Sequence, residues 1–238
     1  MKNTVIIFIL VFYGLVAFGQ SQEKTEIRKL EPFDKIKISK GINVTLREGE
    51  NPEAEIFIIN ANLDDVLIIQ NENELFIRMK TKTYKDVSVN VYVTYQNLKE
   101  IQAGLGGSLE SEDIIETEEL TLVAGMNASI EIEIEVVTLK AAATSSSSLI
   151  KVAGIAKNID INILSGGKYI GNELQCEVAK VRADTSASVQ LCVTEHLNAY
   201  AANGATIKYI GGPSHVDSNT LKGGKILEID NEEEEDED

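Results

Sequence analysis

Histidine is the residue type here best suited to binding a metal ion or sensing pH, and the chain has only two, His196 and His215. A metal site would need further ligands close to both imidazoles. Glu195 precedes His196 in the sequence, but no Cys, Asp or Glu is fixed by sequence beside both histidines. We therefore expect two surface histidines and predict no metal-binding residues.

Alternating glutamates are a second candidate for chemistry. Glu131, Glu133 and Glu135 alternate with isoleucines and valine, which predicts one exposed face of a strand. Polysaccharide lyases built on stacked strands use clustered acidic calcium ligands and a Lys or Arg base on one outer face. Lys151 and Gln190 follow at comparable positions further along the chain. This is a single acidic row rather than a converging cluster, so we predict a solvated strand face and no catalytic residues.

The serine run Ser145–Ser148 and the glycines Gly104, Gly106 and Gly107 resemble reactive motifs only superficially. The serines lack a nucleophile-elbow motif and an assigned base. The glycines lack the following helix and the Lys-Ser/Thr pair of a phosphate-binding loop. We interpret both stretches as turns and predict no cofactor-binding residues.

The elements that position these residues repeat about every 20 residues. Each repeat has a marker position that follows two small residues and precedes an apolar one. The steps between markers are 21, 19, 20, 20, 18 and 19 residues. The markers are Ser108, Ser129, Ser148, Lys168, Ser188, Thr206 and Lys225.

A fixed period of this length is typical of a repeat architecture in which stacking buries a face that one unit cannot bury alone. Each unit reads as a strand, a tight corner and a second strand. Gly, Asn and Ser suit such corners because they tolerate positive φ. The pattern predicts an all-β fold, a right-handed parallel β-helix (β-solenoid) with roughly 20 residues per coil and Gly/Ser/Ala/Asn-centred turns. The alternative is an antiparallel β-sandwich, which gives no reason for turns to repeat in register.

This repeat sets the expected separation of the candidate residues. His196 and His215 each lie ten residues before a marker, so adjacent coils would place them roughly 5 Å apart. A metal site or a pH-sensitive pair is the alternative to two unconnected surface histidines. Cys176 and Cys192 fall in different columns of the repeat, so we expect both to be free or buried thiols rather than a disulfide.

Three further segments complete the predicted organisation. Residues 1–19 have Lys2, an apolar run and a small residue at Gly19, which predicts a signal peptide rather than a membrane anchor. Residues 31–228 form the β-helix domain, less regular over 31–98 and regular over 99–228. The run NEEEEDED at 231–238 predicts a disordered acidic tail that discourages end-to-end stacking rather than a cation site.

The overall charge limits the partners. The formal net charge of −16 disfavours nucleic-acid binding and adsorption to anionic lipid, both of which need basic surfaces. Aromatic residues make up 5% of the chain and Trp is absent, so we expect an aliphatic core. No stretch after the leader is long and apolar enough to predict a transmembrane segment.

The segment beginning at Phe33 resembles a known family. Phe33-Asp34-Lys35-Ile36-Lys37-Ile38 followed by Gly41-Ile42-Asn43-Val44 is similar to the opening of the head GIN domain family, over about residues 31–228. This resemblance implies an exported protein of the type common in Bacteroidota, described as an auto-transporter adhesin head with a β-helical, pectin-lyase-like architecture. It implies no established enzyme activity and no established ligand.

These observations together favour an exported, non-enzymatic β-solenoid that acts as an adhesin or as a surface or periplasmic binding protein. The expected partner is a glycan or another protein, because stacked β faces suit extended ligands. We predict no cofactor and leave the oligomeric state open. Two alternatives remain: a lyase-like glycan-active enzyme, which an outward acidic and basic cluster over three adjacent coils would favour, and a ligand-free structural protein of the cell envelope.

Overall fold

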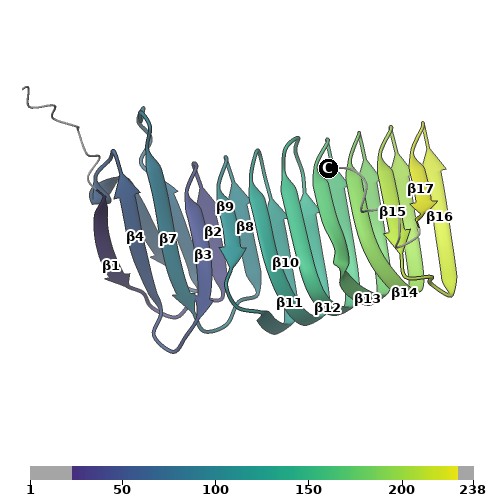
Figure 1. Ribbon diagram of the computed structural model, residues 1–238, viewed down its shortest axis with the longest axis horizontal. Helices are drawn as coiled ribbons and strands as arrows, with labels where there is room; N and C mark the ends of the chain where they lie inside the picture. The colour runs from purple at the N-terminus through teal and green to yellow at the C-terminus, as the bar shows by residue number, and fades with distance from the viewer. Residues whose placement is uncertain (1–22, 230–238) are drawn as a thin grey trace, which may run out of the picture.

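Figure 1 shows the fold as a computed structural model, in which residues 23–229 are described. Strands account for 69% of the structure and helix for 1%, arranged as a β-solenoid of about 6 turns. The predicted β-solenoid is therefore confirmed, while its right-handed sense stays a prediction. The predicted signal peptide and acidic tail lie outside the described residues.

Strands β1–β9 form the N-terminal part of the stack and strands β10–β17 the C-terminal part (Figure 1). A short 3-10 helix, η1 (Leu63–Asp65), precedes β5. The N-terminal strands are β1 (Lys24–Lys29), β2 (Lys35–Ser39), β3 (Asn43–Glu48), β4 (Glu53–Ile59), β5 (Val66–Asn71), β6 (Glu74–Met79), β7 (Ser88–Tyr95), β8 (Glu100–Gly104) and β9 (Ser108–Ser111). The C-terminal strands are β10 (Ile115–Ala124), β11 (Ser129–Ala143), β12 (Leu149–Leu164), β13 (Lys168–Asp184), β14 (Ser188–Ala202), β15 (Thr206–Ile210), β16 (His215–Leu221) and β17 (Lys225–Glu228).

The regular coils pair in parallel, each with the next along the chain. Strands β11–β14 are 15 to 17 residues long, because each runs down one face, around a rounded edge and up the other face (Figure 1). Alternate side chains of both faces point inward and stack by type. One inward column consists of the register partners Leu122, Ala141, Ile161, Val181 and Ala199, which confirms the aliphatic core.

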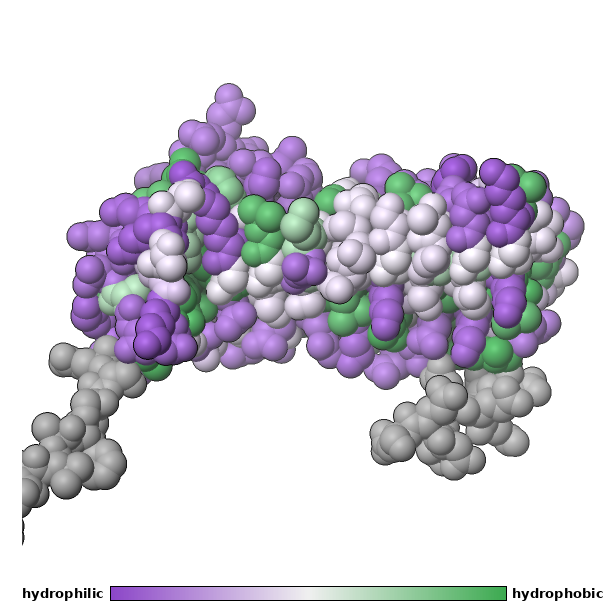
Figure 2. Space-filling model, turned by 90° about the horizontal axis from the view of Figure 1, so that it is seen from above, coloured by the Kyte–Doolittle hydropathy of each residue, from purple (hydrophilic) through white to green (hydrophobic). Residues whose placement is uncertain are grey.

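The edge opposite the rounded one consists of tight corners. Asn127, Ser147, Ser165 and Asn203 have positive φ values of 50° to 59°, as the small-residue columns predicted. Ser129 Oγ donates to Ser108 Oγ across 2.9 Å, so successive corners also bond to each other. Seen from above, the corners form a pale band of intermediate hydropathy over the regular coils (Figure 2).

One marker position was wrong by a single residue. Ser129 pairs with Leu149 rather than with Ser148, and Leu149 pairs with Lys168. The corner between Ala143 and Leu149 holds one residue more than the corner that precedes Ser129. The extra residue moves Ser148 inward, where it is fully buried and its hydroxyl donates to the Ser145 carbonyl.

The N-terminal part mixes parallel and antiparallel pairing. Strands β2 and β3 form one coil, which the coils β6–β7 and β8–β9 flank in parallel. Beyond them, β4 pairs antiparallel with β7, β1 with β4, and β5 with β6. Lys40 and Gly41 have φ values of 66° and 67° and form the turn between β2 and β3. Antiparallel strands thus close this end of the parallel stack.

Candidate binding groove

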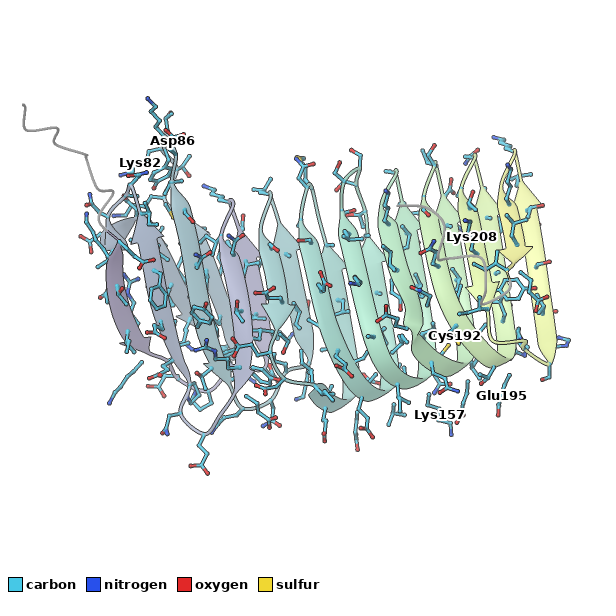
Figure 3. All side chains as sticks on the ribbon, in the orientation of Figure 1. Lys82, Asp86, Lys157, Cys192, Glu195 and Lys208 are labelled. Atoms are coloured by element: carbon cyan, nitrogen blue, oxygen red, sulfur yellow. The ribbon has the colours of Figure 1, made fainter. Side chains whose placement is uncertain are left out.

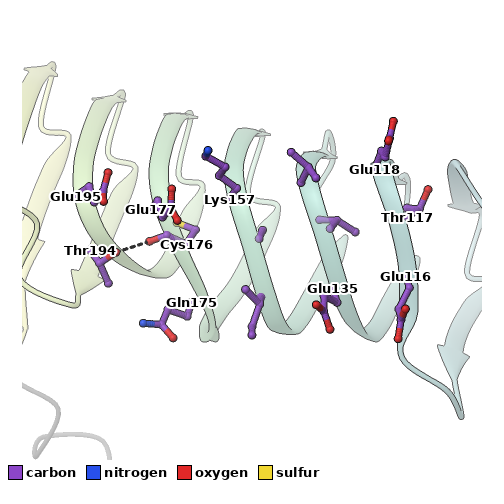
Figure 4. Close-up of a pocket in the computed structure, with 14 residues that line it drawn as sticks. Glu116, Thr117, Glu118, Glu135, Lys157, Gln175, Cys176, Glu177, Thr194 and Glu195 are labelled. Atoms are coloured by element: carbon purple, nitrogen blue, oxygen red, sulfur yellow. Dashed lines mark hydrogen bonds between the residues drawn. The ribbon is translucent and has the colours of Figure 1, made fainter.

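A groove of about 680 Å³ runs along the rounded edge of the solenoid, across β10 to β14. Three consecutive residues of each of the first four strands line it, and two from β14 complete it (Figure 4). Lys157 and Glu195 project outward from this edge (Figure 3). The lining therefore results from stacking one short bend in successive coils.

The middle residue of each bend forms the floor. Thr117, Val136, Ala156 and Cys176 are register partners. In β14 the partner of Cys176 is Val193, and Thr194, one residue further along, lines the groove because the register shifts there. Val136, Ala156 and Cys176 are buried, whereas the threonines are partly exposed. The floor is anchored by two bonds: Thr194 Oγ1 donates to the Cys176 carbonyl across 3.1 Å, and the Cys176 thiol to the Cys192 carbonyl across 3.2 Å.

The residues on either side of the floor form two exposed rims, because neighbouring side chains of an extended backbone point to opposite sides. Figure 4 shows one rim on each side of the floor. The first rim contains Glu116, Glu135, Ile155 and Gln175. The second rim contains Glu118, Val137, Lys157, Glu177 and Glu195.

The groove is strongly acidic. Its rims carry five glutamates and one lysine, Lys157. Val137 and Ile155 are 49% and 58% exposed, so each rim also offers an aliphatic contact. Phe, Tyr and Trp are absent from the lining. Such a surface attracts cationic partners and can bury an apolar side chain against the floor.

The cysteines confirm the expectation of free thiols. Both are free, and Cys176 is buried in the groove floor. Burial raises the pKa of the Cys176 thiol to about 12, with a smaller contribution from nearby Cys192. Because the thiolate is the nucleophilic form, Cys176 is a packing residue rather than a reactive one.

The acidic row predicted on one strand is present on the exposed face of β11. Glu131 pairs in register with Lys151, and their side chains form an ion pair across 2.7 Å. This hydrogen bond raises the pKa of Lys151. Gln190 lies two coils further along the same column, through Ile170. Of the three glutamates in the row, only Glu135 reaches the groove.

The two histidines lie side by side, as the repeat predicted. His196 of β14 and His215 of β16 are register partners, and their ring centroids are 4.8 Å apart. The expectation that no acidic residue lies beside both was wrong. Asp217 has one carboxylate oxygen 3.4 Å from Nε2 of His196 and the other 3.4 Å from Nε2 of His215. It lies two residues after His215 and therefore on the same strand face.

The groove itself was missed from the sequence. The sequence signal is a group of three residues that recurs once in each coil from β10 to β13. Each group lies directly before one of four register partners, which are Glu119, Thr138, Asn158 and Val178. A parallel pairing register is needed to recognise them as one surface. The glycines near Gly106 are a corner, with φ of 77° at Gly106, as predicted.

Comparison with solved structures finds the same fold in several bacterial proteins. A crystal structure described as a "putative adhesin" from Bacteroides fragilis matches with a TM-score of 0.79 and 18% identity, over 87% of this chain and 97% of that one. A second "putative adhesin", from Parabacteroides merdae, matches with a TM-score of 0.70 and 18% identity, over 89% and 98%. A "putative lipid binding protein" from Parabacteroides distasonis matches with a TM-score of 0.68 and 15% identity, over 89% and 98%.

At these identities the likeness concerns the fold alone. Curated proteins gave no significant match. Within residues 23–229, no helix is both long enough and apolar enough to cross a membrane. The family model described as "Putative auto-transporter adhesin, head GIN domain" matches residues 32–213, most of the chain. This chain therefore belongs to the head GIN domain family.

Proposed function

We propose that this protein is an exported, non-enzymatic binding protein of the adhesin type, and that its groove accepts an extended, basic segment of another protein. The observation that carries the proposal is the acidic groove, with five exposed glutamates beside a single lysine. The adhesin descriptions of the family and of its structural neighbours support the same general role.

The size of the groove suits a short extended peptide. Five coils stacked at about 4.8 Å span roughly 19 Å, which is the length of about six extended residues. Each exposed ion pair contributes only about 0.2–1 kcal/mol, so binding requires several pairs at once. The proposed interaction is therefore multivalent, faster to form at low ionic strength, and weakened by salt.

A glycan is the less favoured ligand. Sugar rings commonly stack on aromatic side chains, and none lines the groove. The net negative charge of the rims would also repel a polyuronate chain. The enzyme alternative is also tested, because Lys157 lies beside Glu177 on a rim that also carries Glu118 and Glu195, and a lyase would combine a basic residue with acidic ones.

A fluorescent hexalysine peptide, titrated by anisotropy, tests the proposal. The variant Glu118→Gln/Glu177→Gln/Glu195→Gln removes three rim charges. The matched control Glu23→Gln/Glu50→Gln/Glu72→Gln removes three exposed charges from the N-terminal part. We expect the groove variant to bind at least tenfold more weakly than the control, with a smaller dependence on salt.

Equal weakening in both variants would refute the groove as the binding surface, because general charge would then explain binding. A panel of neutral and anionic glycans tests the alternatives. Binding of a glycan in preference to the peptide, or cleavage of a polyuronate that is lost in Lys157→Ala, would replace the proposed function.

The proposed location is tested by protease shaving of intact cells, with a periplasmic control protein and an antibody to this chain. Loss of the signal while the control stays intact would place the protein at the cell surface, as an adhesin requires. Full protection would contradict surface adhesion and indicate a role inside the envelope.

A further inference from the structure

We propose that His196, His215 and Asp217 bind a divalent late first-row transition-metal ion, with Zn²⁺ as the reference case. The three ligands come from two paired strands, β14 and β16, near the C-terminal end of the solenoid. One ligand atom from each residue lies within 4.8 Å of the other two. The inference is independent of the proposed function, since the acidic groove needs no metal.

The strand register explains why these side chains converge. Parallel pairing sets His196 opposite His215, and Asn198 opposite Asp217. Side chains two residues apart on a strand share a face, so Asp217 lies on the same side as both imidazoles. A paired backbone holds all three residues, which lowers the entropic cost of assembling the site.

The distances are close to those of a tetrahedral centre. Zinc binds imidazole nitrogen and carboxylate oxygen at about 2.0–2.2 Å, so two tetrahedral ligands lie about 3.3–3.5 Å apart. Nε2 of His196 and Nε2 of His215 each lie 3.4 Å from Asp217, but from different oxygens of its carboxylate. These distances exceed the usual 2.7–3.2 Å of an N–H···O hydrogen bond. The three ligand atoms lie within 4.8 Å of one another, and rotation of these exposed side chains would bring one Asp217 oxygen and both nitrogens to tetrahedral spacing.

The donor set selects the kind of ion. Two imidazoles and one carboxylate suit zinc, copper or nickel, whereas calcium and magnesium prefer sites made of oxygen ligands. The three side chains are 41%, 61% and 56% exposed, for His196, His215 and Asp217 in that order. A solvent-facing fourth position therefore stays open to water, as in zinc sites with three protein ligands.

Neighbouring charges do not compete strongly for Asp217. Asn198 separates it from Lys180 in the column of register partners, and Lys180 forms an ion pair with Asp160 across 3.7 Å. On the other side of the histidines, Ser214 Oγ donates to the Glu195 carbonyl across 2.9 Å and ties the two bends together. All of β16 is exposed, so a metal bridge to β14 would stabilise this terminal strand.

Isothermal titration of the full chain with ZnCl₂, in a buffer that does not chelate zinc, tests the inference. We expect one site per chain, and at least tenfold weaker binding in each of His196→Gln, His215→Gln and Asp217→Asn. Two matched controls, Asp86→Asn in the N-terminal part of the stack and Cys192→Ser, should bind zinc as the wild type does. These positions are exposed or partly exposed, and circular dichroism verifies that each variant is folded.

Two further readouts separate a built site from loose capture by carboxylates. Co²⁺ should give the visible absorption of a tetrahedral ion in the wild type and lose it in His215→Gln. Zinc should raise Tm in the wild type, whereas equimolar Ca²⁺ should not. Zinc binding that is unchanged in both histidine variants, or absent from the wild type, would overturn the proposal.

Discussion

Replacing Gly154 by alanine should destabilise the protein strongly, because a side chain there has no room and the backbone is in a glycine-favoured conformation. Gly154 has φ of 107° and lies where the register between β12 and β13 shifts. Its partner in β11 is Ile134. A Cβ atom added to Gly154 would lie 2.1 Å from the Ile134 carbonyl oxygen.

The magnitude has two parts. A positive φ costs a residue with a Cβ atom about 1–2 kcal/mol. Relief of the clash requires the two strands to separate by about 1 Å, which weakens a ladder hydrogen bond worth about 1 kcal/mol. The total of about 2–3 kcal/mol corresponds to a fall in Tm of about 4–12 °C for a domain of this size.

Gly104→Ala is the matched control, since no atom lies within 4 Å of its added Cβ and its φ is not in the positive range. Thermal unfolding followed by circular dichroism at 218 nm compares the two variants with the wild type. We expect Gly104→Ala to stay within about 2 °C of the wild type. A Tm for Gly154→Ala equally close to the wild type would refute the steric argument.

Three other outcomes are expected. At pH 8, iodoacetamide should modify Cys192 before Cys176, because the Cys176 pKa of about 12 leaves about one thiol in ten thousand ionised. Peptide mass spectrometry measures the two rates of modification, and equal rates would contradict the burial argument. The hydrogen bond from Lys82 lowers the pKa of Asp65, so its stabilising effect is present above about pH 4 and is lost as pH falls through the lowered value. Asp65→Asn should therefore lower Tm at pH 7, the difference from the wild type should shrink as the pH falls below about 4, and an equal Tm at pH 7 would count against the ion pair. Ile161→Ala, in a fully buried column, should reduce the free energy of unfolding by about 2–4 kcal/mol in urea titrations, and a change below about 1 kcal/mol would indicate that neighbouring coils collapse into the space.

The sequence allowed much of the fold to be predicted because the stacking repeats the same constraints. Leu122, Ala141 and Ile161 each lie seven residues before a marker of the repeat, and they are register partners in one inward column. The corner between Ala143 and Leu149 was misread by one residue. Small corner residues differ little from one another, so an inserted serine leaves no signal in the pattern.

The antiparallel closure of the N-terminal end could not be derived in the same way. Strands β4 and β5 have ordinary strand patterns, and their pairing direction depends on which edges remain free after β2 and β3 have joined the stack. Edge pairing is a property of the assembled sheet rather than of a local segment.

The sequence by itself determined the class of fold, the period of the coil, the small-residue corners and the spacing of the two histidines. Tertiary structure alone decided which residues share a surface. Asp217 lies 21 residues from His196 in the sequence but beside it across the strand pair, and the groove gathers one bend from each of five coils. The physical reason is that the pairing register decides which residues of successive coils become neighbours. The register depends on the length of every corner and bend, so the period of the sequence does not give it alone.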